Sequence, residues 1–156
     1  MLGTIRTPIG LLAVKSEEGK LTEVDILPAC SNESERIKKL SLANEVNHQL
    51  SQYFHNASFQ FHLPIDVRGT DFQKKVWKIM TRIPPGKVMT YGEVAKKLDS
   101  SPRAVGNACQ ANPLPIIIPC HRIVSQSGLG GYGGHTAGEH LAIKSWLLQH
   151  EGVPIA

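Results

Sequence analysis

Apolar and polar positions alternate through the first 27 residues of the chain. Residues 2–27 therefore predict two or three short strands, separated by turns at Pro8–Gly10 and Glu18–Gly19. A helix is expected to begin at Ser34, because apolar residues then recur at helical spacing. These residues are Ile37, Leu40, Val46, Leu50, Tyr53 and Phe54. Alternation returns at residue 58 and predicts one more strand, ending at Pro64, so the first half is expected to be a small α/β lobe.

The second half shows helical periodicity with clearly marked helix starts. Each start has a threonine or serine that can act as an N-cap. The starts are Thr70–Gln73, Thr90–Glu93 and Ser101–Pro102. The first helix is expected to stop at Pro84, the second at Leu98 and the third near Gln110. Two short helices joined by a tight turn predict a helix-turn-helix.

A short apolar run bounded by prolines, Pro115–Cys120, predicts a buried strand. A cysteine at the end of such a run is by default an inert core residue. His121 and Arg122 follow at once, however, and both are costly to bury unpaired, so the chain is expected to meet a polar site here. A nearby imidazole can take the thiol proton, directly or through a water, and the resulting thiolate is a reactive nucleophile.

Composition is that of a soluble globular protein, with 156 residues of which 41% are hydrophobic and 19% charged. No stretch approaches the roughly 18 consecutive apolar residues of a membrane span, and the N-terminus lacks signal-peptide features. A cytoplasmic location is expected, or a nuclear one in a eukaryote. Cys30, Cys109 and Cys120 are odd in number and lack C-x-x-C spacing, so reduced thiols and no bound metal are expected.

Positive charge is concentrated in the second half. Residues 1–69 carry seven Lys/Arg and eight Asp/Glu, whereas residues 70–156 carry ten and five. This asymmetry indicates either a polyanionic partner or a solvated helical face. The third predicted helix offers mostly small side chains after one leading arginine, Arg103. Small residues allow close approach to a sugar-phosphate backbone but read few base edges, which favours binding to DNA without sequence readout.

Residues 115–124, PIIIPCHRIV, resemble the active-site signature of the methylated-DNA–protein-cysteine methyltransferases, also called O6-alkylguanine-DNA alkyltransferases. Residues 69–98, 103–115 and 143–152 resemble the remaining blocks of that family in the same order. The resemblance implies a ribonuclease-H-like α/β N-terminal lobe over residues 1–68, with a small antiparallel sheet and a helix. A mainly α C-terminal domain with a helix-turn-helix would follow.

The same resemblance, over residues 69–156, implies the catalytic residues. Cys120 would accept the alkyl group, His121 would be its water-mediated base, and Glu151 would orient that histidine. Tyr91 would donate a hydrogen bond to the flipped base and crowd the neighbouring phosphate.

Further positions follow from the resemblance on the DNA side and around the base. Arg103 would fill the space that the extruded base leaves, and Asn112 would tie the recognition helix to the active-site strand. The implied DNA-binding residues are Arg103, Thr70, Ala104, Gly106 and Asn112. The implied pocket residues are Pro115 in the wall and Tyr132 and Gly133 in the lip.

The implied function is DNA repair by a single-turnover transfer. O6-alkylguanine would be flipped out of double-stranded DNA, and its alkyl group would pass irreversibly to Cys120, because a thioether has no activated leaving group. No cofactor is expected, and the protein is expected to act as a monomer. The preferred alkyl group, activity on O4-alkylthymine and the effect of extra residues near 135–140 on the pocket stay open.

Two other functions remain open from the sequence. A DNA-binding regulator could use the helix-turn-helix without catalysis, although a cysteine at position 120 argues against it. A thiol hydrolase could use Cys120 with a histidine, and it would turn over repeatedly on an acyl substrate.

Overall fold

The computed structural model describes residues 2–27, 41–132 and 138–154, with side chains from residue 4 onward and from residue 45 in the first helix. The chain divides into two units, Met1–Arg68 and Gly69–Ala156. Within the described ranges, no helix is both long and apolar enough to cross a bilayer.

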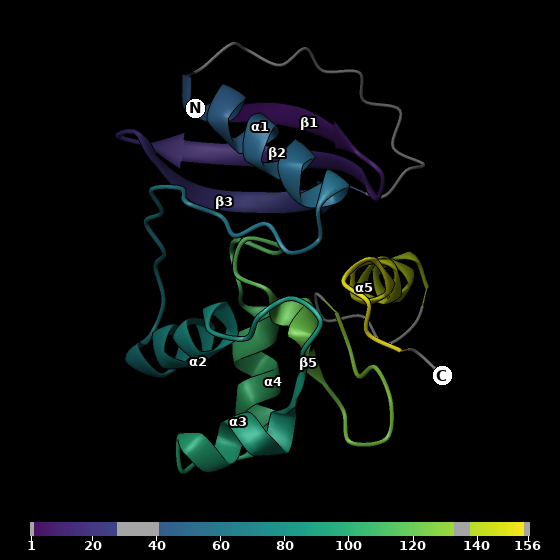
Figure 1. Cartoon of the computed structure of the whole chain (residues 1–156). Helices are drawn as coiled ribbons and strands as arrows, with labels where there is room; N and C mark the ends of the chain where they lie inside the picture. Colours follow the sequence, from purple (N-terminus) through teal and green to yellow (C-terminus); the bar gives the residue numbers. More distant parts are fainter. Residues whose placement is uncertain (1, 28–40, 133–137, 155–156) are drawn as a thin grey trace. The chain divides into compact units, whose positions relative to one another are not determined.

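The first unit is a three-stranded antiparallel sheet with one helix packed on it (Figure 1). The strands are β1 (Leu2–Thr7), β2 (Gly10–Glu17) and β3 (Lys20–Leu27), in the order β1-β2-β3, and the helix is α1 (Ser41–His55). Alternate strand residues are buried against helix residues at spacings of three and four, as the sequence pattern predicts. The buried residues include Ile5, Leu12, Val14, Leu21, Val24, Val46, Leu50 and Tyr53.

Two predictions for the first unit have different outcomes. The predicted strand over residues 58–64 is wrong, because those residues form no β ladder and a single parallel bridge between Ile65 and Leu21 follows them. Pro64 lacks an N–H group and cannot continue a ladder. The segment is held instead by Gln49 of α1, whose side-chain amide donates to the His62 carbonyl oxygen and accepts from its N–H. The predicted helix start at Ser34 lies outside the described residues.

The second unit contains α2 (Asp71–Thr81), α3 (Tyr91–Lys97), α4 (Pro102–Gln110) and α5 (Glu139–His150). The three predicted N-caps are confirmed, because each cap hydroxyl accepts a hydrogen bond from the backbone N–H three residues later. The predicted helix-turn-helix corresponds to α3 and α4 (Figure 1). The indole N–H of Trp77 on α2 donates to the Ala108 carbonyl oxygen at 2.8 Å and so fixes α4 against α2.

A short parallel ladder connects the start of α3 to the segment that carries the cysteine. Strand β4 (Met89–Thr90) pairs with β5 (Ile123–Val124), and β5 directly follows a 3-10 helix, η1 (Cys120–Arg122). The ladder therefore holds the segment after Cys120 beside the N-cap of α3.

The predicted buried strand over Pro115–Cys120 is wrong in shape, although much of the segment is buried. The chain makes a tight turn with a single bridge between Pro115 and Ile118, and Ile116 has a φ of 75°, outside the strand region. Three prolines between residues 113 and 119 remove the backbone donors that a strand ladder needs. An apolar run shows that a segment is buried but does not determine its backbone conformation.

Candidate active site

Helix η1 buries three chemically active side chains in successive positions. Cys120 is 7% exposed, His121 0% and Arg122 7%. The helix is closed by a hydrogen bond from the Arg122 N–H to the Pro119 carbonyl oxygen at 3.0 Å. Because three polar groups are costly to bury, each must find partners inside the unit.

Glu151, immediately after α5, is the shared partner of His121 and Arg122. Its Oε2 accepts from His121 Nε2 at 2.8 Å and from Arg122 Nη2 at 2.9 Å, and its Oε1 accepts from Arg122 Nε at 2.9 Å. Arg122 Nη1 also donates to the Ile83 carbonyl oxygen. Burial alone would raise the pKa of the Glu151 carboxyl, but the hydrogen bonds from His121 and Arg122 lower this pKa to about 2. The carboxylate is therefore ionised at neutral pH.

The hydrogen bond to Glu151 determines which nitrogen of His121 can act as a base. Burial lowers the pKa of His121, and Glu151 offsets this shift only in part, so the ring is neutral at pH 7. The proton sits on Nε2, which donates to Glu151, and the lone pair therefore sits on Nδ1. Nδ1 is buried and has no hydrogen-bond partner among the residues that the structure describes. It is the atom of His121 that can accept a proton.

The thiol of Cys120 is protonated when the site is at rest. Burial raises its pKa, while a hydrogen bond from Asn112 and the positive charge of Lys144 act in the opposite direction. The thiolate expected from the sequence therefore requires a base that removes this proton.

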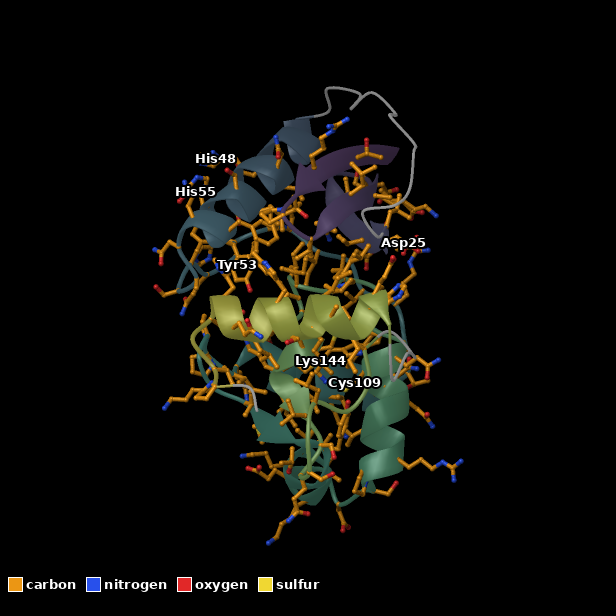
Figure 2. The ribbon with its side chains drawn as sticks, turned by 90° about the vertical axis from the view of Figure 1, so that its right-hand side faces the viewer. Asp25, His48, Tyr53, His55, Cys109 and Lys144 are labelled. Carbon is orange, nitrogen blue, oxygen red and sulfur yellow. The ribbon has the colours of Figure 1, made fainter. Side chains whose placement is uncertain are left out.

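Lys144 is a site residue that the sequence reasoning missed. It lies on α5 and is 0% exposed, and its ammonium donates to the carbonyl oxygens of Ile123, Leu129 and Gly131 at 2.7, 2.6 and 2.9 Å. Figure 2 shows it near Cys109 of α4, with which it interacts electrostatically. Its place in the sequence could have indicated burial, because it lies in the apolar stripe of α5 with Leu147 and Leu148.

Asn112 connects the end of α4 to the turn before Cys120. Its Nδ2 donates to the Ile118 carbonyl oxygen at 2.8 Å, and its Oδ1 accepts from the Leu114 N–H at 2.9 Å. The first bond spans the turn that replaces the predicted strand, and the second fixes the residues that lead into it. Asn112 therefore fixes the path of the chain into η1, and its side chain faces the inside of the unit.

Replacing Asn112 with alanine is expected to lower the free energy of unfolding by about 1–3 kcal/mol, because the Leu114 N–H and the Ile118 carbonyl oxygen each lose a partner. The pKa of Cys120 should also rise, since a lowering contribution is lost. Denaturant unfolding followed by tryptophan fluorescence measures the first effect, because Trp77 and Trp146 both lie in the second unit. Asn107, which is exposed on α4, provides the control, Asn107→Ala. Equal losses in the two variants would contradict the connecting role of Asn112.

Tyr91 and the loop from Leu129 to Tyr132 lie against each other. A Cβ atom placed on Gly130 would lie 2.8 Å from Tyr91 Cε2, and Gly130 has a φ of +75°. Both the close contact and the positive φ therefore favour glycine at this position. Burial raises the pKa of the Tyr91 hydroxyl, which therefore keeps its proton at neutral pH. Tyr132 is buried, and Gly133 lies outside the described residues.

The other predicted site residues are spread over the surface of the second unit. Arg103 is exposed in the first turn of α4, and Ala104 and Gly106 follow it on the same helix, each half-buried. A Cβ on Gly106 would lie 4.0 Å from the Tyr91 ring, so α4 passes close to Tyr91. Thr70 is exposed, and its hydroxyl accepts the N-cap bond of α2. Pro115 is half-buried in the turn before Cys120.

The described ranges contain no group of three or more His, Cys, Asp or Glu residues that could hold a metal ion. Cys30 lies outside those ranges. His48 and His55 are exposed on α1 of the first unit, where each contacts another residue of the same helix (Figure 2).

Comparison with known families assigns both units. Residues 71–153 match the DNA-binding domain of 6-O-methylguanine DNA methyltransferase, and residues 1–67 match the ribonuclease-like domain of the same family. The chain belongs to the 6-O-methylguanine DNA methyltransferase family. The ribonuclease-like N-terminal lobe and the helical C-terminal domain expected from the sequence are thereby confirmed.

Relatives in this family match over almost the whole chain. A methylated-DNA–protein-cysteine methyltransferase of Saccharolobus islandicus (strain M.16.27) is 35% identical over 153 residues, which are 98% of this chain and 96% of the relative. The crystal structure of Mycobacterium tuberculosis OGT in complex with DNA has a TM-score of 0.80 and 35% identity, covering 97% of this chain and 92% of that one. The O6-methylguanine DNA methyltransferase of Methanococcus jannaschii has a TM-score of 0.69 and 31% identity, covering 98% and 95%.

Proposed function

We propose that this protein repairs O6-alkylguanine in duplex DNA by transferring the alkyl group to its own Cys120. The observation that carries the proposal is the buried Cys120–His121–Glu151 arrangement, in which the cysteine is followed by a neutral histidine oriented by an ionised carboxylate. The arrangement lies in the part of the chain that matches the DNA-binding domain of a DNA methyltransferase family.

Proton transfer is the first requirement of the reaction. The Cys120 thiol is neutral at rest, and His121 Nδ1 holds the free lone pair that can accept its proton through a water molecule. Glu151 stabilises the imidazolium that results, because its carboxylate already accepts a hydrogen bond from the Nε2–H group. The thiolate that remains is the nucleophile.

Alkyl transfer then follows as an in-line displacement. The Cys120 sulfur forms a bond to the alkyl carbon as the bond between that carbon and the O6 oxygen of guanine breaks, and the electron pair leaves with the base. A proton delivered to the departing guanine completes the balance, and the protonated hydroxyl of Tyr91 is the proposed donor. The thioether carries no good leaving group, so each molecule reacts once.

Access to the alkyl group requires that the base leave the stack, which costs a few kcal/mol. Arg103, exposed in the first turn of α4, is the proposed side chain that fills the vacated space. The half-buried Ala104 and Gly106 would let α4 approach the backbone closely, and Thr70 is proposed to contact DNA at the start of α2. Pro115, Tyr132 and Gly133 are the proposed walls and lip of the base pocket.

One titration tests this function. A fixed amount of protein is incubated with increasing O6-methylguanine duplex, and the intact protein is weighed by mass spectrometry. The expected result is the addition of one methyl group, saturating at one per chain and located at Cys120. Unmodified protein after incubation with excess duplex would overturn the proposal. Loss of more than one methyl group from the DNA per protein chain would instead indicate a hydrolase.

A further inference from the structure

Lys144 carries a positive charge in a place where a lysine is costly to bury. Its side chain is 0% exposed, and all three ammonium protons are used by backbone carbonyl oxygens. No carboxylate lies within ion-pair distance of it among the residues that the structure describes. A charge held without a counter-ion needs a reason beyond packing.

The three carbonyl groups belong to two segments that the reaction needs. Ile123 lies in β5, three residues after Cys120. Leu129 and Gly131 flank Gly130, whose backbone lies against the Tyr91 ring. Lys144 thus fastens the loop beside Tyr91 to the strand that leaves the nucleophile. Its Nζ also lies 5.8 Å from the centroid of the Tyr91 ring, where a cation–π interaction is favourable.

The charge of Lys144 also acts on the sulfur. It lowers the pKa of Cys120, against the larger effect of burial, and a thiolate at Cys120 in turn favours the ammonium. Lys144 therefore supplies positive charge that opposes the negative charge formed when Cys120 is deprotonated.

We propose that Lys144 is a positioning residue of the transfer reaction, which ties the loop at Leu129–Gly131 to the strand after Cys120 and supplies the positive charge that stabilises the thiolate. The inference rests on the function proposed above. It adds a residue that acts on the nucleophile and on the Tyr91 side of the pocket at once.

The proposal has a distinctive pH signature. Loss of one proton from the Cys120–Lys144 pair gives either a thiol beside an amine or a thiolate beside an ammonium. These two forms carry the same number of protons, so their ratio is independent of pH. The part of the reactivity that comes from thiolate whose proton has left to solvent, and not to His121, should rise about tenfold per pH unit at first. It should then level off near pH 8, because burial lowers the pKa of Lys144 to about 8.

No other described group facing the pair should titrate between pH 7 and 9. Burial lowers the pKa of His121 and raises that of Tyr91, and burial together with Cys120 raises the pKa of Cys109 to about 12. The pKa of Glu151 is held at about 2 by its hydrogen bonds, which outweigh burial. Arg122, the charged group that follows His121, is ion-paired with Glu151.

The test compares wild type with Lys144→Met, which removes the charge, and Lys144→Arg, which keeps a charge that does not titrate. Lys15→Met, at an exposed lysine of the first unit, is the control. Two rates are measured from pH 6.5 to 9.5: single-turnover methyl transfer from O6-methylguanine duplex, and carbamidomethylation of Cys120 by iodoacetamide, quantified on its peptide. The second needs no DNA and does not depend on the proposed function.

Wild type and Lys15→Met are expected to level off near pH 8 in both assays. Lys144→Met should react more slowly at pH 7, by about tenfold for each unit that the Cys120 pKa rises, and its rate should keep rising beyond pH 8. The rate of Lys144→Arg should not level off near pH 8, but at pH 7 it should stay closer to wild type than that of Lys144→Met. If Lys144→Met does not fold, the comparison of Lys144→Arg with wild type is sufficient.

Levelling at the same pH in the Lys144 variants and wild type, or a wild-type rate that rises steadily through pH 8, would overturn the role of Lys144. If wild type shows the expected iodoacetamide profile but takes no methyl group from DNA, the proposed function fails while the effect of Lys144 on the thiol stands.

Discussion

Replacing Cys120 with alanine should abolish methyl transfer completely, with no methyl addition at any ratio of O6-methylguanine duplex to protein. The other described cysteine, Cys109, should not substitute for it. Burial, with a smaller contribution from Cys120, raises the pKa of Cys109 to about 12, so its thiolate is scarce at neutral pH. Intact mass after incubation with excess duplex measures the result.

Cys109→Ala is the matched control for this experiment, because it also removes one thiol from the second unit. It should accept one methyl group at a rate close to that of wild type. Cys120→Ala should still bind the duplex, since Arg103, Ala104 and Gly106 lie on α4 and Thr70 is the N-cap of α2. Methylation of Cys120→Ala at another residue would move the acceptor elsewhere and would contradict the proposed nucleophile.

The helical part of the fold could be predicted because its signals are local. Each N-cap and its partner N–H lie three residues apart, as at Thr70 and Gln73, so the sequence displays the whole interaction. The small residues of α4 and the sequential Cys120 and His121 are equally visible. Such features depend on a few neighbouring residues and on little else.

The parts that sequence reasoning missed depend on distant contacts. The turn before Cys120 is held by Asn112, which bonds to a carbonyl group six residues later. Arg122 donates to the Ile83 carbonyl oxygen, 39 residues away, and Lys144 reaches the carbonyl oxygen of Ile123. An apolar run or a helical lysine gives no sign of such partners, because the pattern records burial and not what the backbone bonds to.

Replacing Glu151 with glutamine should destabilise the second unit by about 3–5 kcal/mol, because Arg122 and His121 then face a neutral partner in a buried site. Guanidinium unfolding followed by tryptophan fluorescence measures the loss, since Trp77 and Trp146 both belong to this unit. Glu23→Gln is the control, because Glu23 pairs with Lys15 on the surface and such pairs contribute only about 0–1 kcal/mol.

The pH dependence of the stability loss distinguishes a loss of the Glu151 charge from a packing defect. Because its pKa is about 2 in the folded chain against an ordinary 4.5, Glu151 contributes stability that is present above about pH 4.5 and is lost as pH falls toward 2. Glu151→Gln should lack this part of the acid sensitivity, so its deficit relative to wild type should shrink between pH 7 and pH 3. A deficit that stays constant over that range would show that the carboxylate charge is not what the site requires.

The same substitution should slow methyl transfer even at a temperature at which the variant is fully folded. Without the carboxylate, His121 loses the interaction that raises its pKa and becomes a weaker base for the Cys120 thiol. Transfer should fall by about tenfold for each pKa unit lost, because less of the thiolate–imidazolium pair forms. More of the remaining rate should then come from thiolate formed by proton loss to solvent, which moves the pH–rate profile to higher pH. Glu23→Gln should leave the profile in place. An unchanged profile in Glu151→Gln, measured where the variant is fully folded, would mean that the proton of Cys120 leaves by a route that does not involve His121.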